Sequence, residues 1–355
     1  MSTRKRRSTA SAIALAAAVT TGATLLLTGC GPTTPAPVSS SAAATVPASA
    51  PPSSPSGANP PAASGSAAPS ARPSASATGG GAAPVPNGTG GSGLTISDGT
   101  DYVVMNGTRV DFGTVVRDLS WNPAGTRAAF IDGSGNLVVA DPDGSGRTVV
   151  AHNPGDQVWS HPAWQVMPYD SRDQLPAKDN IIFADSVNGV SRLVAVPATG
   201  GTPAPITLNA DFGSGVPPLP QTGNTWPNTG GVHGTAVYTN TGTGEVYLRD
   251  DFLRQMGSPQ TPGSEPALAP DESEIVFVRS VAGHDHLFEL SLQAQHPAPK
   301  DLTPTADTDY TEPAWSPDGR TIAARTPAGI VTLAADGTGA PVLVAPSTGL
   351  PAYRG

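Results

Sequence analysis

Acidic and histidine side chains recur at one position of a repeated phrase. The residue before Pro-Ala is His161, Glu265 and Glu312 in three copies, and Leu350 in a fourth; Asp118 holds the same position in a looser copy, three residues before a tryptophan. If the copies are arranged around an axis, these side chains gather at one mouth of a central channel. Carboxylates beside an imidazole suit a divalent cation or a basic peptide segment. The alternative is that they cap local turns and face solvent, as many carboxylates do.

A second candidate is the run His284-Asp285-His286. Alternate side chains of an extended chain lie on one side, and imidazole is a common metal ligand. Two ligands do not make a site, however, and we expect this run in a hairpin loop, where a solvated turn is the simpler interpretation. The pair supports the alternative function, a metal-dependent lyase or hydrolase acting on envelope glycans. A divalent cation is possible in that case, and we predict no other cofactor.

Motifs of several enzyme classes are absent from the sequence. It contains no Gly-x-Ser-x-Gly elbow and no phosphate-binding loop, and its single cysteine is Cys30. We therefore assign no catalytic residue. With one cysteine, no intramolecular disulfide can form, so a folded domain must be stabilised by its own core.

The phrase belongs to a longer internal repeat. The segment WNPAGTRAAFIDGSGNLVVADPDGSG, which begins at Trp121, aligns with WSPDGRTIAARTPAGIVTLAADGTG, which begins at Trp315, with one gap. In each copy a short strand ends at Trp, a Pro-x-Gly turn follows, and three more short strands are separated by Gly- and Asp-containing turns. No helical periodicity is visible, so we expect an all-β fold.

Six copies account for the region 94–355. Looser copies contain the aromatic or leucine anchors Trp164, Trp226, Leu268 and Tyr353. Residues 94–112 supply three strands of a copy that lacks its first strand, and the region around Tyr353 supplies a first strand alone. Because one four-stranded unit cannot bury both of its faces, we predict a six-bladed β-propeller closed by the N- and C-terminal strands.

The residues that carry this repeat resemble a known family. Trp315-Ser-Pro-Asp-Gly319, followed by an apolar strand and then Ala335-Asp-Gly337, is similar to the WD40-like (PD40) repeat of TolB-like propellers. The resemblance covers roughly 94–355. It implies a six-bladed propeller that acts as a binding platform for proteins. TolB itself carries an α/β domain before its propeller, whereas this chain has a low-complexity segment in that place.

The N-terminus has the composition of an export signal. A basic cluster at 4–7 precedes an uncharged apolar stretch, and Leu27-Thr-Gly-Cys30 follows. This end resembles a bacterial lipobox, in which the cysteine receives a lipid and becomes the first residue of the mature protein. We therefore predict a signal peptide at 1–29, lipidation of Cys30, and an extracytoplasmic protein anchored to the cell membrane. The alternatives are an uncleaved membrane anchor and simple secretion, and export through either the general or the twin-arginine route is left open.

The segment 30–93 is composed almost entirely of Pro, Ala, Ser, Thr and Gly, so we predict a disordered tether.

The region from Asp98 onward is strongly acidic. It carries 14 basic and 28 acidic residues, a net charge of −14. Such a surface repels nucleic acid and tolerates cations or basic partners. We expect a binding scaffold for an envelope protein or a cell-wall component.

Overall fold

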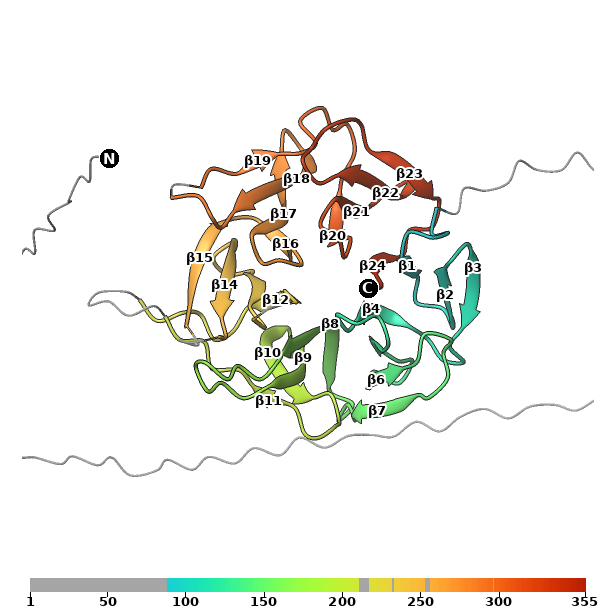
Figure 1. Cartoon of the computed structure of the whole chain (residues 1–355), viewed down its shortest axis with the longest axis vertical. Coiled ribbons are helices and arrows are strands. Elements are labelled where there is room, and N and C mark those ends of the chain that lie inside the picture. Colours follow the sequence, from blue (N-terminus) through green and yellow to red (C-terminus); the bar gives the residue numbers. More distant parts are fainter. Residues whose placement is uncertain (1–87, 211–216, 232, 253–255, 296) are drawn as a thin grey trace, which may run out of the picture. The chain divides into compact units, whose positions relative to one another are not determined.

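The structure is a computed structural model that describes residues 88–210, 217–231, 233–252, 256–295 and 297–355. The predicted signal peptide, Cys30 and residues 30–87 of the predicted tether lie outside the described residues. All regular structure in the described part of the chain is β-strand, arranged as six four-stranded antiparallel sheets around a central channel (Figure 1). The predicted six-bladed β-propeller is confirmed.

The blades are numbered in chain order, and the strands of each run from the channel outward. Blade 1 contains β4 (Arg117–Trp121), β5 (Ala128–Ile131), β6 (Leu137–Ala140) and β7 (Thr148–Ala151). Blade 2 contains β8 (Gln157–Met167), β9 (Lys178–Val187), β10 (Val190–Pro197) and β11 (Ala204–Pro205). Blade 3 contains β12 (Asn224–Thr229), β13 (Ala236–Asn240), β14 (Glu245–Asp250) and β15 (Met256–Pro262).

Blade 4 contains β16 (Ser264–Leu268), β17 (Glu274–Val281), β18 (His284–Ser291) and β19 (Lys300–Asp301). Blade 5 contains β20 (Thr311–Trp315), β21 (Thr321–Thr326), β22 (Gly329–Ala334) and β23 (Val342–Ala345). Blade 6 combines β24 (Leu350–Tyr353) with β1 (Leu94–Ser97), β2 (Tyr102–Met105) and β3 (Thr108–Asp111).

The ring is closed by the pairing of β24 with β1. Leu94 is opposite Tyr353 and Ser97 is opposite Leu350, in antiparallel register. The first strand missing from the N-terminal copy is therefore supplied by the other end of the domain, as predicted. This pairing joins segments about 250 residues apart in sequence.

The hydrophobic core lies between neighbouring blades. One cluster joins Ala129 and Leu137 of blade 1 to Trp159, Ile181 and other residues of blade 2, and another joins blades 4 and 5. The strands that form these interfaces are short runs of buried apolar residues, because both faces of each sheet are covered by its neighbours.

Two of the repeated tryptophans connect a blade to the one before it. The indole Nε1 of Trp315 in blade 5 donates to the carbonyl of Ala267 in blade 4, at 3.0 Å. That of Trp121 in blade 1 donates to the hydroxyl of Thr95 in blade 6, also at 3.0 Å. The hydroxyl of Thr95 in turn donates to the carbonyl of Ala352. These two tryptophans therefore occupy equivalent places between neighbouring blades.

Two local predictions are corrected by the structure. Trp226 is not the anchor of blade 3; the inner strand β12 continues to Thr229, which holds that position. His284 and His286 are not in a loop, because the turn of their hairpin is only Ala282-Gly283, with φ of 53° and 96°. A two-residue turn of this hand lets pairing resume at once, so β18 begins at His284.

Candidate functional site

Five inner strands share an unusual backbone conformation at one position. The residue there has a φ between 48° and 55°, in the left-handed region: Asp118, His161, Trp226, Glu265 and Glu312. In each case the strand pairing shifts register across this residue, which makes it the centre of a β-bulge. A bulge re-aims a side chain, and a left-handed non-glycine residue costs about 1–3 kcal/mol. These five residues, called the polar layer below, therefore occupy equivalent places around the channel.

Proline helps to explain why the bulge recurs. Four of the five residues are followed by proline, namely His161, Trp226, Glu265 and Glu312. Proline has no N–H to donate to the neighbouring strand, so it is tolerated in a sheet where the ladder is already interrupted. The sixth inner strand, β24, has proline after Leu350 but pairs with β1 without a shift.

Within the polar layer, carboxylates bind the backbone of the next blade. The Asp118 Oδ2 atom accepts a hydrogen bond from the backbone N–H of His161 at 3.1 Å. The Glu265 Oε2 atom accepts one from the backbone N–H of Glu312 at 2.7 Å. These bonds satisfy donors that the bulges release from strand pairing, and they orient both carboxylates toward the channel.

Glu312 makes a different set of contacts. Its Oε1 atom lies 3.4 Å from Nε2 of His161 and 3.2 Å from the indole Nε1 of Trp226, which donates to it. Blades 5 and 2 are three blades apart in a ring of six, so the contact with His161 crosses the channel. The rings of His161 and Trp226 also pack together, with centroids 5.7 Å apart. Arg325, on the adjacent strand β21, places a guanidinium nitrogen 3.9 Å from the same Glu312 oxygen.

The polar layer changes the proton affinity of its members. Burial, reinforced by the nearby negative charge of Glu312, raises the pKa of Glu265 to about 7. Burial opposes ionisation of Glu312 as well, but the hydrogen bond and positive charge of His161 outweigh it and lower the pKa of Glu312. For His161 burial favours the neutral form, yet the bond to Glu312 and the surrounding carboxylates raise its pKa overall. Glu312 and His161 therefore form an ion pair whose strength depends on pH.

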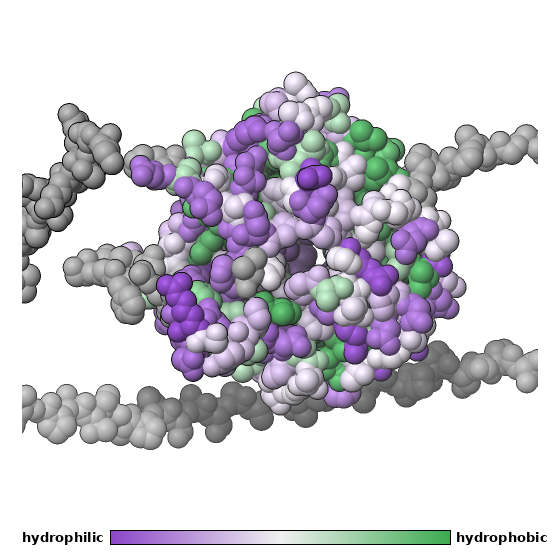
Figure 2. Space-filling model, in the orientation of Figure 1, coloured by the Kyte–Doolittle hydropathy of each residue, from purple (hydrophilic) through white to green (hydrophobic). Residues whose placement is uncertain are grey.

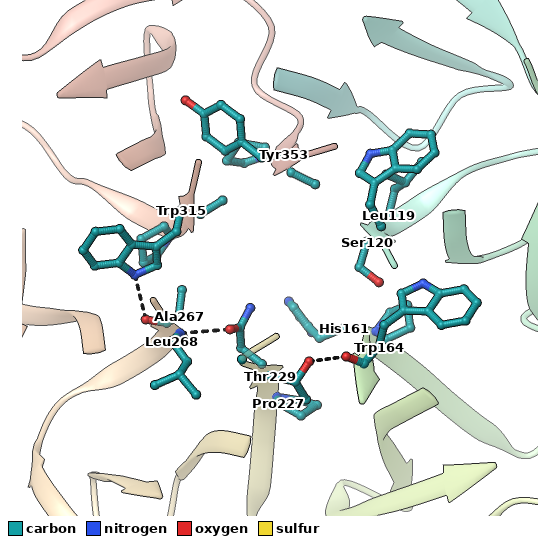
Figure 3. Close-up of a pocket in the computed structure, with 18 of the residues that line it drawn as sticks. Leu119, Ser120, His161, Trp164, Pro227, Thr229, Ala267, Leu268, Trp315 and Tyr353 are labelled. Carbon is teal, nitrogen blue, oxygen red and sulfur yellow. Dashed lines mark hydrogen bonds between the residues drawn. The ribbon is translucent and has the colours of Figure 1, made fainter. Parts of the chain in front are cut away.

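The polar layer lies at one end of a cavity of about 390 Å³, which is lined by residues from the inner strands of all six blades. Figure 3 labels lining residues from each of these strands. The space-filling surface is hollowed at this central position (Figure 2). Small side chains on the inner strands leave the room: Ser120, Asn228, Ala267, Ala314 and Ala352. Prolines contribute much of the rest of the wall, both directly after the polar layer and in the turns at the far ends of the strands. The cavity thus has a polar, partly ionised end, and proline and alanine side chains form part of its sides.

Three buried polar atoms of the lining residues have no hydrogen-bond partner among the described residues. They are the Ser120 hydroxyl, the indole Nε1 of Trp164 and Nδ1 of His161. Trp164 is only 6% exposed, and the equivalent indoles of Trp121 and Trp315 both find an acceptor. A buried donor without a partner costs about 1–3 kcal/mol. The hydrogen-bonding groups of the cavity wall between blades 1 and 2 are therefore less completely paired than those beside Trp121 and Trp315.

The structure brings together the four residues that the sequence singles out for the channel mouth. Asp118, His161, Glu265 and Glu312 all lie in the polar layer, on strands and not in loops, and each is partly buried. Leu350 also lines the cavity, but without the bulge. Sequence reasoning missed Trp226, because it was aligned with the anchor tryptophans. Alignment on the proline that follows it would have placed Trp226 with His161, Glu265 and Glu312.

The two other histidine candidates have separate environments. In His286, which is 4% exposed, Nδ1 lies 2.9 Å from Oδ2 of Asp301. In His284, Nδ1 lies 3.4 Å from Oδ1 of Asp309. Each imidazole is thus paired with a different carboxylate of the chain. Among the residues that the structure describes, no group of three His, Cys, Asp or Glu side chains is arranged to hold a metal ion.

The described residues also include no helix long and apolar enough to span a membrane. The apolar stretch of the predicted signal peptide lies before residue 88, outside the described residues.

Comparison with known proteins finds similarity at the level of three-dimensional structure. No protein-family model and no curated protein matches the sequence. TolB from Acinetobacter baumannii matches 74% of this chain with 15% identity and a TM-score of 0.49, and the match spans 65% of the TolB chain. A putative TolB from Agrobacterium tumefaciens matches 68% of this chain and 78% of its own, with 18% identity and a TM-score of 0.44.

A gluconolactonase from Xanthomonas campestris matches 72% of this chain and 80% of its own, with 12% identity and a TM-score of 0.47. At these identities no residue role is transferred from any of the three proteins. The arrangement of six sheets in Figure 1 establishes by itself that the chain is a six-bladed propeller.

Proposed function

We propose that this protein is an extracytoplasmic binding module, anchored to the membrane through a lipid on Cys30, whose propeller holds a positively charged group of an envelope partner in its central cavity. The observation that supports this best is the combination of a cavity of about 390 Å³ with three carboxylates among the residues that line it. No enzyme activity is proposed, since no specific arrangement of the described residues favours one.

Each carboxylate of the polar layer has an oxygen to offer. Asp118 Oδ2, Glu265 Oε2 and Glu312 Oε1 accept the hydrogen bonds described above. Their second oxygens accept none from the described residues, and they are not among the buried atoms that lack a partner. A ligand with several N–H groups could therefore bond to more than one carboxylate at once.

The walls favour a particular shape of cation. Proline and alanine side chains line the path to the polar layer, so a long apolar stem can lie along the channel while its charged head reaches the carboxylates. A lysine or arginine side chain of a partner protein has this form. Arginine is the better match, because its planar fork of donors pairs with two carboxylate oxygens.

The rest of the chain is consistent with display of such a site away from the membrane. The net charge of −14 from Asp98 onward attracts basic partners and disfavours close contact with anionic lipid. The predicted tether at 30–93 would supply this distance, since an extended proline-rich chain spans about 3 Å per residue.

The proposal is tested with a short peptide amide, acetyl-Pro-Arg-Pro-amide, and the same peptide with citrulline in place of arginine. Citrulline keeps the shape of arginine but carries no charge. We expect the arginine peptide to bind the purified protein and the citrulline peptide to bind at least tenfold more weakly. Replacing two carboxylates together (Glu265→Gln with Glu312→Gln) should abolish the difference. Equal binding of the two peptides, or no binding of either, would contradict the proposal.

A further inference from the structure

The contact between His161 and Glu312 is the starting point. It joins blade 2 to blade 5 across the channel, at 3.4 Å between Nε2 and Oε1. The two side chains are 25% and 16% exposed, so water only partly screens the attraction between them. Trp226 covers His161 with its ring and donates to the same Glu312 oxygen. One carboxylate of the proposed binding site is thus already held by a cation of the protein itself.

We propose that His161 is a built-in competitor for the ligand: its protonated ring occupies Glu312, and a positively charged ligand group takes its place when the imidazole loses a proton to solvent. This inference rests on the proposed function, because it concerns the regulation of the same site. It adds a testable property, namely that binding of a cation is coupled to release of a proton.

The geometry gives the physical reason. An incoming guanidinium or ammonium group that reaches Glu312 must come close to His161 as well, since both contact one carboxylate. Two positive charges beside one carboxylate repel each other inside a cavity of low polarity. The charges can be balanced if the imidazole becomes neutral, after which its Nε2 lone pair needs no anion.

The charged groups that face His161 are three carboxylates, and all of them favour the protonated imidazole. Asp118 on β4 and Glu265 on β16 stabilise the protonated ring together with Glu312 on β20. Arg325 on β21 approaches Glu312 from the side and weakens its hold on the imidazole only in part. Trp226 on β12 carries no charge, and the sixth blade contributes Leu350 at this position.

The ionisation of Glu265 also makes ligand binding depend on pH, and its effect must be separated from that of His161. The pKa of Glu265 is about 7, so this group also loses a proton near neutral pH and makes the site more negative. The experiment is therefore done in a Glu265→Gln background, where residue 265 no longer titrates and a pH dependence of binding can be assigned to His161.

The dissociation constant of acetyl-Pro-Arg-Pro-amide is measured by calorimetry from pH 5.5 to 8.5. In the Glu265→Gln protein it should fall with rising pH, by up to about tenfold per unit below the pKa of His161, and then become constant. Adding His161→Asn should remove this dependence and tighten binding at pH 5.5. Asparagine suits the test because it tolerates the left-handed backbone better than most residues.

Proton release gives a second measurement that needs no change at His161. Binding heats of the Glu265→Gln protein in two buffers of different ionisation enthalpy at pH 6 should differ by an amount that corresponds to release of a fraction of one proton per peptide.

The pH series has a matched control, in which His284→Asn replaces His161→Asn. This variant should leave the pH dependence of binding unchanged, because His284 lies on β18 and is paired with Asp309.

The outcomes separate the two proposals. Selective binding of the arginine peptide with no proton release and no effect of His161→Asn would overturn the competitor role and leave the binding module standing. No selective binding at any pH would overturn both. Weaker binding of the His161→Asn protein at pH 5.5 would also overturn the competitor role, since it would show that the imidazole helps the ligand to bind.

Discussion

Glu312 and His161 are 151 residues apart in the sequence and lie on opposite blades, yet Oε1 of Glu312 is 3.4 Å from Nε2 of His161. The pair connects two sheets that are not neighbours in the ring. It also places an ion pair in the lining of the central cavity, where the net charge depends on how many protons the pair and its neighbour Glu265 hold.

The ion pair should stabilise the propeller in acid more than in base. Because the pKa of His161 is raised in the folded state, its contribution is present below the ordinary histidine value and is lost as pH rises through the folded-state pKa. Glu312 remains ionised over this range, since its pKa is lowered. We expect His161→Asn to cost on the order of 1 kcal/mol at pH 5.5 and little at pH 9, measured by urea unfolding. A cost independent of pH would mean that packing against Trp226 dominates.

Glu265 should give the same direction of pH dependence as His161, but its substitution should stabilise the protein and not destabilise it. Its pKa rises from 4.5 unfolded to about 7 folded, so folding favours the protonated acid and the wild-type protein loses stability as pH increases from about 4.5 to 7. Glutamine imitates the protonated acid and can still accept from the N–H of Glu312. We expect Glu265→Gln to be nearly neutral at pH 4.5 and stabilising by about 2 kcal/mol at pH 8, after allowance for partial contact with solvent. Thermal melts at both pH values, with Glu245→Gln as control, provide the measurement.

The tryptophans between blades allow a comparison of matched substitutions. Trp315→Phe removes the hydrogen bond to the Ala267 carbonyl and should cost about 1 kcal/mol beyond the loss of ring area. Trp164→Phe removes a buried N–H that has no partner among the described residues, so it should cost less. Denaturant unfolding of the two variants would give the difference. If Trp164→Phe were the more damaging change, an unrecognised acceptor for its N–H would be indicated.

Closure of the ring by β24 should be essential for folding. Removal of residues 348–355 would expose the edge of β1, whose residues Leu94 and Ile96 are each 1% exposed. It would also leave the Thr95 hydroxyl without the Ala352 carbonyl to which it donates. We expect the shortened protein to lose its cooperative melting transition, and a synthetic 348–355 peptide to restore part of it. A shortened protein that melts like the full chain would show that five complete blades suffice.

Lipidation is predicted from the lipobox alone and concerns residues outside the described part of the chain. Changing Cys30 to Ala should prevent acylation and cleavage before Cys30. We expect the wild-type protein in the membrane fraction and labelled by a radioactive fatty acid, and the variant unlabelled. Two acyl chains bind a bilayer stably where one is marginal, so partial labelling would be accompanied by partial release. Labelling of the Cys30→Ala protein would contradict the assignment.

Much of this fold could be predicted from the sequence, because the residues that specify each turn and strand lie close together along the chain. In the copies that begin at Trp121 and Trp315, the turns and strands are specified within about 30 residues. Asn122 and Ser316, which follow the two tryptophans, each close the Pro-x-Gly turn in the same way. The split sixth blade was visible too, because a strand was missing from one end of the domain and left over at the other.

The candidate site could be predicted only in part. The position before Pro-Ala marked three members of the polar layer, and the place before Trp121 marked Asp118, since each copy of a repeat places that position at the same radius of the ring. Trp226 was missed because blade 3 keeps the proline of the motif but not its aromatic anchor. The strand that holds His284 and His286 was missed because a turn of only Ala282 and Gly283 is shorter than the loop expected there.

By itself, the sequence determined most of the hairpins, the number of blades, the closure of the ring and the equivalent positions of four polar-layer residues, because backbone hydrogen bonds and turn residues act between neighbours. Only the tertiary structure decided that Glu312 meets His161, that Trp226 joins them, and that Glu265 holds its proton near neutral pH. Those properties depend on the diameter of the closed ring and on burial. Both arise only when all six blades pack together, so they cannot be predicted from any single copy of the repeat.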